Sequence, residues 1–334
     1  MTVARVGVIG VGAVAQVAHL PVLAGRDDVD LVGLCDNDLA KAQALATRFG
    51  VVAAYDDIED LLRYGRPDAV LVATPNHLHE VHVRTALSAG CAVLCERPLA
   101  LTSDGVERIQ DAARLAGRPV VVGMNHRYRS DVQALRAFVA GGELGALRAI
   151  RTGWYYFRPS RAELGWRRRP QESGGGALFD LGLPLLDLSL WLADCPEELS
   201  VRGIVHQTAG HAVEDAASAL LTCASGLSVF VDVAWRYVGD QERFWLDVMG
   251  EAGSARIHPL RVYKEMHGAP VNVTPTGAAS RENLFSASYR AEWASFLAVV
   301  REEVAAPDLE QQVLVHRTLE AVYVSAREGR TVDV

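Results

Sequence analysis

Two glycines and an alanine follow the first apolar segment of the chain, in the pattern Gly10-x-Gly12-x-x-Ala15. Gly10 allows a tight turn, Gly12 leaves room for a phosphate against the backbone, and Ala15 lets a helix pack closely on the strand. The helix that follows directs its free N–H groups and the positive end of its dipole at the turn. The pattern predicts a cradle for the pyrophosphate of a dinucleotide, to which Ala13 and Val14 also contribute.

A carboxylate follows the second apolar segment. The run Asp30–Cys35 ends in Asp36, which lies 24 residues after Gly12. This is close to the spacing of about 20 residues at which an acidic side chain accepts hydrogen bonds from an adenosine ribose. Because no Arg or Lys follows Asp36 directly to bind a 2′-phosphate, the sequence favours NAD over NADP as the cofactor.

Polar residues also follow the third and fourth apolar segments. Thr74–Asn76 come directly after the third, with His79 close behind, and Glu96–Arg97 end the fourth. The carboxyl ends of parallel strands lie at one edge of a sheet, where ligands bind, so we expect these residues near the glycine turn. His77, His79 and His82 have no carboxylate or thiol cluster beside them to complete a ligand set, so we expect no metal site.

Length, charge and cysteine content limit the class of protein. The chain has 334 residues, enough for two domains, and half of them are hydrophobic. A net charge of −8 gives no reason to expect nucleic acid or a membrane as partner. The five cysteines form no Cys-x-x-Cys pair, which is typical of reduced thiols. We therefore expect a cytoplasmic protein, with the N-terminal apolar residues in a strand rather than a signal peptide.

The alternation of segments changes near residue 122. Before it, short apolar runs alternate with helical segments, which predicts a doubly wound parallel sheet. After it, longer runs with period-two character predict a largely antiparallel sheet with one covered face. The expected strands are Arg5–Ile9, Leu31–Cys35, Ala69–Ala73, Ala92–Cys95 and Pro119–Val122, then Leu147–Tyr156, Leu199–Gln207, Ala216–Cys223, Leu227–Trp235, Phe244–Met249 and Ala255–His258. The sequence thus predicts an α/β protein with domains at 1–122 and 123–334.

Taken together, these motifs resemble the glucose–fructose oxidoreductase, inositol dehydrogenase and rhizopine-catabolism (Gfo/Idh/MocA) family over essentially the whole chain. The resemblance rests on the glycine turn, Thr74–Asn76 with His79, the Glu-x-Pro at Glu96–Pro98, and Asn125-x-Arg127-Tyr128. It continues through Trp166-Arg167, the segment Gly174–Asp187 and the C-terminal stretch into Ala321–Val332. No single motif is specific, but the combination is.

The resemblance implies an N-terminal Rossmann domain that binds NAD and a second α/β domain with an open sheet for substrate binding and oligomerisation. The implied substrate is a sugar, a polyol or a related small molecule, and the implied assembly is a homodimer or homotetramer. The implied cofactor contacts are Gly10, Gly12, Ala13, Val14, Asp36, Thr74, Pro75, Asn76, His79, Glu96, Arg97 and Asn125. The implied substrate contacts are Arg127, Tyr156, Trp166, Arg167 and Asp180, with Arg97 and Asp180 as the catalytic residues.

Two positions depart from the family pattern. The family's Glu-Lys-Pro reads Glu96-Arg97-Pro98 here, and the His of its Asp-x-Gly-x-His-x-x-Asp is Pro184. Arginine donates hydrogen bonds but is a poor proton shuttle, and proline does not titrate. General acid–base catalysis is typically worth about 10²–10⁴-fold in rate. Loss of both groups should slow alcohol oxidation unless another residue takes over.

Four other side chains could carry a proton, although aromatic residues on strands usually pack instead. They are His126, Tyr128, Tyr155 and Tyr156. A basic patch, Arg161 with Arg167–Arg169, is either a solvated loop or a site for an anionic group of the substrate.

Asp180 and Pro184 lie in one apolar segment, Gly176–Leu192. A proline inside a continuous helix removes a hydrogen bond and clashes with a carbonyl, so we expect a kink or a helix that begins near Gly182. Asp180 either meets the substrate or caps the backbone near the glycine-rich turn.

We interpret the chain as an NAD-dependent oxidoreductase that acts on a sugar, polyol or related carbonyl or imine compound. Arg97 would polarise the reacting group, and Asp180 would orient the substrate or assist proton transfer. A fixed cation suits reduction of a C=O or C=N bond. The two substitutions leave alternatives open: a non-catalytic NAD-binding regulatory protein, or a non-redox NAD-dependent enzyme such as a glycosidase.

Overall fold

The computed structural model describes residues 3–156, 161–196, 198–257, 259–275 and 283–334. The chain forms two compact units. Unit 1 comprises Met1–Asn125 and Phe285–Leu309, and unit 2 comprises His126–Leu284 and Glu310–Val334. The predicted fold class, a parallel doubly wound sheet followed by a second α/β sheet domain, is confirmed.

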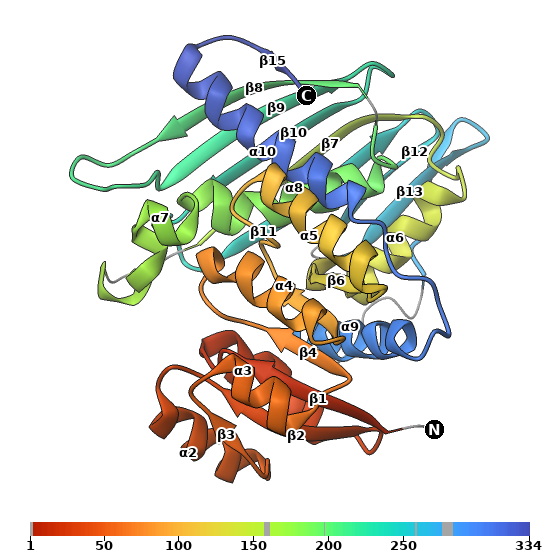
Figure 1. Ribbon diagram of the computed structural model, residues 1–334. Coiled ribbons are helices and arrows are strands. Elements are labelled where there is room, and N and C mark those ends of the chain that lie inside the picture. The colour runs from red at the N-terminus through yellow and green to blue at the C-terminus, as the bar shows by residue number, and fades with distance from the viewer. Residues whose placement is uncertain (1–2, 157–160, 197, 258, 276–282) are drawn as a thin grey trace. The chain divides into compact units, whose positions relative to one another are not determined.

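Unit 1 contains a six-stranded sheet in the order β3-β2-β1-β4-β5-β6 (Figure 1). Its strands are β1 (Ala4–Ile9), β2 (Val29–Cys35), β3 (Ala54–Tyr55), β4 (Ala69–Val72), β5 (Ala92–Glu96) and β6 (Val120–Gly123). All neighbouring strands run parallel. The order reverses direction between β1 and β4, which is the arrangement of dinucleotide-binding folds. The carboxyl ends of these strands therefore form the expected ligand-binding edge.

Helices connect the strands of unit 1. They are η1 (Ala15–His19) with α1 (Leu20–Ala24), α2 (Leu39–Phe49), α3 (Ile58–Asp60) with η2 (Leu61–Gly65), η3 (Asn76–Leu78) with α4 (His79–Ser88), and α5 (Ser103–Ala116). After β6, η4 (Asn125–Tyr128) begins at the last residue of this part of unit 1 and continues into unit 2. Local signals explain several boundaries. Asp38 caps α2 through the N–H of Lys41, and Thr102 caps α5 through the N–H of Gly105. Gly50 and Gly117 end the same helices in left-handed conformations.

One helix of unit 1 comes from the far end of the chain. Helix α9 (Leu284–Val300) inserts Trp293, Phe296 and Leu297 into the same buried cluster as β1 and β4. The sequence placed this segment within 123–334, because it follows the second group of strands. Its apolar side chains pack against the Rossmann core instead, and Arg301 binds Asp28 at 2.7 Å.

Unit 2 contains a nine-stranded sheet in the order β14-β13-β12-β11-β7-β10-β9-β8-β15. Its strands are β7 (Leu147–Tyr155), β8 (Leu199–His206), β9 (Ala216–Cys223), β10 (Ser228–Ala234), β11 (Arg243–Gly250), β12 (Gly253–Ile257), β13 (Arg261–Met266), β14 (Ala269–Asn272) and β15 (Val332–Asp333). β7 and β10 pair in parallel, and the other pairs are antiparallel. The sequence missed β3, β13 and β14, because short strands and exposed edge strands carry little periodic signal.

Helices cover one face of this sheet (Figure 1). The helices of unit 2 are α6 (Ser130–Ala140), η5 (Arg161–Arg168), α7 (Pro170–Ser173), η6 (Leu178–Gly182), α8 (Leu183–Leu192) and α10 (Glu310–Glu328). Alternate residues of β8, β9 and β10 are buried towards α8 and α10, whereas the residues between them are partly or fully exposed. This alternation leaves the other face of the sheet open to solvent, as the period-two pattern predicted.

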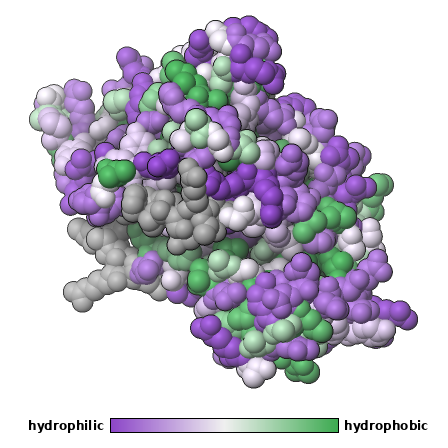
Figure 2. Space-filling model, turned by 90° about the vertical axis from the view of Figure 1, so that its left-hand side faces the viewer, coloured by the Kyte–Doolittle hydropathy of each residue, from purple (hydrophilic) through white to green (hydrophobic). Residues whose placement is uncertain are grey.

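The stretch Pro170–Leu192 is apolar and long enough to cross a membrane by length and composition alone. It is 89% buried inside the structure, however, as a core helix of a folded domain is. Outside the core, the face of the molecule in Figure 2 presents mainly hydrophilic side chains, with apolar residues in small groups among them.

The docking of α9 is expected to stabilise unit 1. Phe296 is 0% exposed, so Phe296→Ala should lower the free energy of unfolding by about 3–5 kcal/mol. Val304, which is 51% exposed in the same unit, provides the control, and Val304→Ala should change stability by less than about 0.5 kcal/mol. Urea denaturation measures both. Equal effects of the two variants would show that α9 does not belong to the unit 1 core.

Candidate active site

The glycine turn of unit 1 has the geometry of a phosphate cradle. Gly10 has φ +90°, and a Cβ there would lie 2.7 Å from the backbone of Ala73. Around Gly12, by contrast, a Cβ would meet no atom within 4 Å, so the backbone is open to a ligand. Ala15 is fully buried against the strand, as its small size requires. The first turn of helix, with Gln16 N–H bonded to the Gly12 carbonyl at 3.1 Å, begins directly at this open backbone.

Asp36 lies beside the glycine turn at the end of β2. Its carboxylate accepts hydrogen bonds from the N–H of Val11 at 2.9 Å and of Asp38 at 3.1 Å. It also forms an ion pair with Lys41 Nζ at 2.8 Å, a contact that sequence reasoning missed. Burial tends to raise the pKa of Asp36, but Lys41 and the two N–H groups outweigh it and hold the pKa below its ordinary value. The side chain is therefore an ionised acceptor next to the cradle.

His79 ties together the loops that follow β4 and β5. Its Nδ1 lies 2.6 Å from the carbonyl oxygen of Pro98, and its Nε2 lies 2.8 Å from that of Thr74. The side chain is buried, and burial lowers its pKa, although both carbonyls favour the protonated ring. His82 bonds to the Thr74 hydroxyl at 3.1 Å. The histidines of this segment thus hold the backbone of the two loops.

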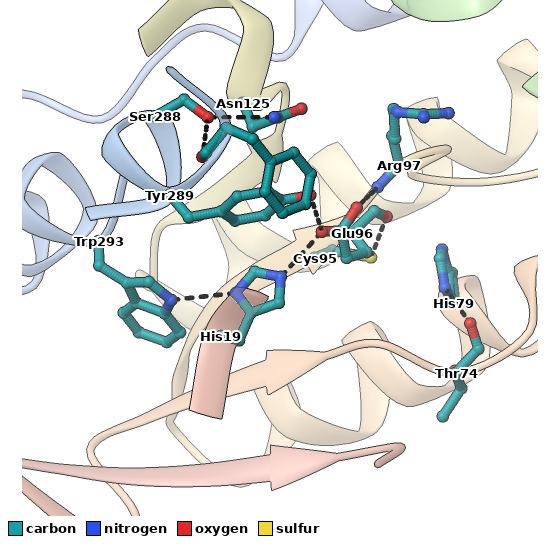
Figure 3. A network of polar contacts seen from close by, with 11 residues as sticks. His19, Thr74, His79, Cys95, Glu96, Arg97, Asn125, Ser288, Tyr289 and Trp293 are labelled. Carbon is teal, nitrogen blue, oxygen red and sulfur yellow. Dashed lines mark hydrogen bonds and ion pairs between the residues drawn. The ribbon is translucent and has the colours of Figure 1, made fainter. Parts of the chain in front are cut away.

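A buried polar network lies at the end of β5 and is drawn in Figure 3. Trp293 Nε1 donates to Nδ1 of His19 at 3.0 Å, so the ring proton of His19 is on Nε2, which lies 2.8 Å from Glu96 Oε1. Tyr289 donates to the same oxygen at 3.4 Å, and the N–H of Arg97 donates to the other at 3.2 Å. Burial raises the pKa of Glu96, but these donors and the charge of Arg97 lower it below its ordinary value.

A second buried acid lies near Glu96. Glu292 on α9 is 0% exposed, and neither of its carboxylate oxygens has a hydrogen-bond partner among the residues that the structure describes. Burial, together with the negative charge of Glu96, raises the pKa of Glu292 well above its ordinary value. The pKa values of the two acids are therefore shifted in opposite directions, that of Glu96 downwards and that of Glu292 upwards.

The remaining expected cofactor residues of unit 1 lie at the same edge of the sheet. Asn125 follows β6 and donates to Ser288 of α9 at 3.2 Å (Figure 3). Thr74–Asn76 follow β4, and Arg97 follows β5 with its side chain partly exposed. The structure thus brings the expected cofactor residues to the carboxyl ends of β1, β2, β4, β5 and β6.

In unit 2, the segment that carries Asp180 is irregular. Residues Leu178–Gly182 form a single π-helical turn, η6, which continues directly into α8. Ala177, Gly182 and Leu183 all have right-handed helical dihedral angles, and the N–H of Leu183 binds the carbonyl of Leu178, so the helix runs on from Ala177 through a π-bulge. Pro184 follows this bulge inside the helix, and the expected helix start near Gly182 is wrong. π-Turns of this kind are frequent at functional sites.

The Asp180 carboxylate is held by two side chains. Trp235 Nε1 donates to Oδ2 at 2.9 Å, and Arg167 Nε lies 3.8 Å from Oδ1. The guanidinium of Arg167 stacks on Trp166, 4.5 Å from the ring centroid. The side chain of Asp180 is 16% exposed, and that of Arg167 is 37% exposed. The structure therefore brings Trp166, Arg167 and Asp180 together, with Trp235 as a partner that sequence reasoning missed.

Arg127 lies in a different cluster. It forms a bidentate ion pair with Asp187, at 2.7 and 2.6 Å, and donates to Gln311 at 3.0 Å. Gln312 donates to the same carboxylate at 2.7 Å. Both charged groups of this pair are largely buried, at 15% and 2% exposure. The sequence expected Arg127 to bind substrate, but in the structure its guanidinium joins η4 to α8 and α10.

The other candidate proton carriers mostly pack. His126 stacks on Phe244, with ring centroids 5.1 Å apart. Tyr155 donates a hydrogen bond to Asp232, and burial with this bond raises the pKa of Tyr155 to about 12. Tyr156 follows β7, where its N–H binds the Ala234 carbonyl at 2.8 Å.

The arginines of the expected basic patch have different partners in the structure. Arg169 pairs with Glu172, with Nε 2.6 Å from a carboxylate oxygen, whereas Arg167 turns to Trp166 and Asp180. The side chain of Arg161 lies outside the residues that the structure describes.

Glu214 is a further residue that sequence reasoning missed. Its Oε1 accepts hydrogen bonds from the N–H groups of Gly176 and Leu178, at 2.9 and 3.0 Å, and from the Tyr323 hydroxyl at 2.8 Å. It therefore caps the start of the segment that carries Asp180. A Cβ on Gly176 would lie 1.9 Å from the Glu214 carbonyl oxygen, so a larger residue does not fit there. A lone glutamate before a strand carries no motif that would have revealed this role.

Comparison with known proteins agrees with this geometry. Residues 4–124 match a family described as "Oxidoreductase family, NAD-binding Rossmann fold", and residues 132–256 match the "GFO/IDH/MocA C-terminal domain". The chain is 28% identical to D-glucoside 3-dehydrogenase of Escherichia coli (strain K12), over 99% of this chain and 97% of that protein. It is also 28% identical to D-apiose dehydrogenase of Paraburkholderia graminis, over 95% and 86% of the two chains.

A solved structure is similar throughout. The crystal structure of GenD2 from gentamicin A biosynthesis, in complex with NAD, superposes with a TM-score of 0.87, at 27% identity, over 100% of this chain and 97% of that one. Fold and motifs thus define an oxidoreductase with an NAD-binding Rossmann domain. The chain belongs to the Gfo/Idh/MocA family, and NAD, the cofactor expected from Asp36, is confirmed for it.

The residues of unit 1 fit this cofactor. The open backbone at Gly12 and the following helix start suit the pyrophosphate, and Asp36 suits the ribose hydroxyls. When bound, NAD supplies or accepts the hydride of the redox reaction. The protein residues bind and orient it at the carboxyl edge of the sheet.

The protonation states of the two buried acids lead to opposite predictions for stability. A folded-state pKa above the unfolded value means that Glu292 destabilises the fold increasingly as pH rises above about 4.3. Glu292→Gln should therefore be more stable than the wild type at pH 7, and the difference should shrink towards pH 5, by up to about 1.4 kcal/mol per pH unit.

Glu96 is the matched comparison, because its pKa is lowered. Its contribution to stability is present above about pH 4.3 and is lost as pH falls further, so Glu96→Gln should destabilise the protein at pH 7. Urea denaturation at several pH values measures both variants. Parallel stability–pH curves for wild type and Glu292→Gln would contradict a protonated Glu292.

Proposed function

We propose that the protein interconverts a secondary hydroxyl and a ketone on a sugar, with Arg97 and Asp180 as the side chains that act on the substrate. The observation that carries the proposal is the placement of Arg97 at the end of β5, directly after the buried Glu96 network and beside the residues expected to bind NAD. This is the edge of a doubly wound sheet at which ligands bind.

Arg97 stabilises charge on the reacting oxygen. Its guanidinium remains protonated over the working pH range and donates hydrogen bonds to a carbonyl or an alkoxide. Because it exchanges no proton, the proton that the reacting oxygen gains on reduction or loses on oxidation must pass through another group. The Glu96 carboxylate fixes the backbone of Arg97 through the N–H of that residue.

Asp180 orients the substrate and takes part in proton transfer. Its carboxylate is partly exposed and next to Arg167, so it can accept a hydrogen bond from a hydroxyl. Position 184, where the family has a histidine, is a buried proline in the first turn of α8 and supplies no titratable group. Asp187, the other acid of this motif, is buried in its ion pair with Arg127, so Asp180 is the partly exposed titratable side chain of the motif.

The choice of a sugar is supported by the relatives. The names of the D-glucoside 3-dehydrogenase and the D-apiose dehydrogenase place a sugar as the substrate of two proteins that match nearly the whole chain. Trp166 and Arg167 add an aromatic surface and a cationic donor beside Asp180, which suits a ring with several hydroxyl groups.

The activity is tested with D-glucosides, aldoses and their keto derivatives, with NADH absorbance as the readout. Arg97→Ala should lower kcat by about 10²–10³-fold, because a donor to the developing oxyanion is lost. Asp180→Asn should lower it by about 10²–10⁴-fold. Arg114, whose side chain is 78% exposed in α5, provides the control, and Arg114→Ala should retain the parent activity. Full activity of the Arg97 or the Asp180 variant would refute the assigned role.

The substitutions at positions 97 and 184 also favour a second candidate, a protein that binds NAD without turnover. The double variant Arg97→Lys, Pro184→His separates the two. If the parent binds NADH but turns over no sugar, and the double variant gains polyol oxidation, then the protein is a binding protein on a former enzyme fold. Product formation without net change in NADH would instead indicate a non-redox enzyme such as a glycosidase.

We also propose that the open face of the unit 2 sheet joins copies of the chain. By strand register, Ile204, Leu220, Met249 and Tyr263 lie on this face, and they are 53, 41, 43 and 38% exposed. Phe230 pairs with Leu220 across β10 and β9 on the same face. Exposed apolar residues on one face of a sheet are typical of a subunit interface.

A charge on this face should disrupt the assembly. Leu220→Glu is expected to shift the protein to a smaller species in sedimentation equilibrium, because association would bury the new carboxylate. Leu115, which is 85% exposed on α5, provides the matched control, and Leu115→Glu should leave the mass unchanged. The same mass for both variants would place the interface elsewhere.

A further inference from the structure

Trp235 occupies a position that a purely packing role does not explain. It follows β10 directly and is only 2% exposed. A buried indole must give its N–H an acceptor, and here the acceptor is an ionisable side chain rather than a carbonyl. Its Nε1 lies 2.9 Å from Oδ2 of Asp180, which is 55 residues away in the sequence. Hydrogen bonds to a carboxylate are stronger than those between neutral groups.

Two adjacent residues, Glu214 and Asp215, hold both partners of the Trp235–Asp180 hydrogen bond. The carbonyl of Asp215 accepts a hydrogen bond from the N–H of Trp235 at 2.8 Å, which holds the backbone of the donor. The preceding residue, Glu214, binds the N–H groups of Gly176 and Leu178, which holds the start of the turn that carries the acceptor. The dipeptide Glu214-Asp215 therefore sets the position of Trp235 relative to Asp180.

The bond also decides how the carboxylate of Asp180 is presented. An aspartate on an irregular π-turn has two side-chain torsions that the backbone alone does not fix. The indole holds Oδ2, and Oδ1 then faces Arg167 Nε at 3.8 Å. Without the indole N–H, nothing holds Oδ2, and the carboxylate can rotate so that both oxygens, rather than Oδ1 alone, turn towards Arg167.

We propose that Trp235 is a positioning residue for Asp180: its indole N–H holds one carboxylate oxygen so that the other is presented to the substrate. The proposal rests on the role given to Asp180 above and adds a residue that no motif of the sequence singles out. Trp235 does not itself touch the substrate, so its removal acts on turnover through Asp180.

The test uses the full-length protein and the variant Trp235→Phe, which keeps an aromatic ring but removes the donor. We expect kcat on the sugar substrate to fall about 10-fold or more, with KM changed less. Trp154 provides the matched control, because its indole also donates to a carboxylate, that of Glu242, in the same unit. Trp154→Phe should retain the parent kcat within about twofold.

A double-mutant cycle shows whether the effect passes through Asp180. If it does, Trp235→Phe should cost little more in an Asp180→Asn background, because residues that act as a unit are not additive. Thermal unfolding of each variant separates this from a loss of fold. Equal kcat values for Trp235→Phe and Trp154→Phe, or full additivity in the cycle, would overturn the proposal.

A spectroscopic measurement keeps the proposal testable even without turnover. The ¹⁵N-labelled protein gives one indole N–H signal per tryptophan, and Trp235→Phe identifies the relevant one. Asp180→Ala should move this signal, whereas Asp232→Ala, which removes a carboxylate bound to Tyr155 and Ser218, should not. If the indole N–H signal of Trp235 does not move in Asp180→Ala, the contact between the two residues is refuted. If the signal moves but no sugar is turned over, the positioning contact stands and the proposed function fails.

Discussion

The buried carboxylate of Glu96 is the interaction on which unit 1 depends. A charge removed from water must be compensated by hydrogen bonds. Glu96 obtains them from the next residue, Arg97, and from two residues that are distant in sequence, His19 after the glycine turn and Tyr289 on α9. Satisfying this one group fixes the start of the first helix, the loop after β5 and the returning helix (Figure 3). The residues that line the carboxyl edge of the sheet are thereby held in place.

The neighbouring acid, Glu292, responds to the buried charge of Glu96. Glu292 lies in the same core, and burial together with the negative charge of Glu96 raises its pKa well above the ordinary value. The pKa of Glu96 is lowered by its hydrogen-bond donors, whereas a second charge at this site would be repelled at low dielectric. The network has a defined charge as well as a defined geometry.

In unit 2, a second set of hydrogen bonds between distant segments holds the turn that carries Asp180. Glu214 caps the glycine-rich turn, Tyr323 supports Glu214, and Trp235 binds Asp180. The proline that follows Leu178–Gly182 lies inside a continuous helix, directly after a π-bulge that interrupts the regular hydrogen-bond pattern. The family histidine is absent at this point, and the surroundings of Asp180 are built from an indole and a guanidinium instead.

The sequence by itself determined the doubly wound fold, the glycine turn, Asp36 and the substitutions at 97 and 184, because these depend on local patterns: apolar periodicity, turn residues and short motifs. The chemistry of proline also predicted an irregularity in the segment Gly176–Leu192, but not that it takes the form of a π-bulge in a continuous helix. Only the tertiary structure decided that α9 joins the Rossmann core, that Arg127 pairs with Asp187, and that His19, Glu214 and Trp235 support the candidate site. These are long-range contacts between side chains, and burial and charge compensation at such distances leave no periodic trace in the chain.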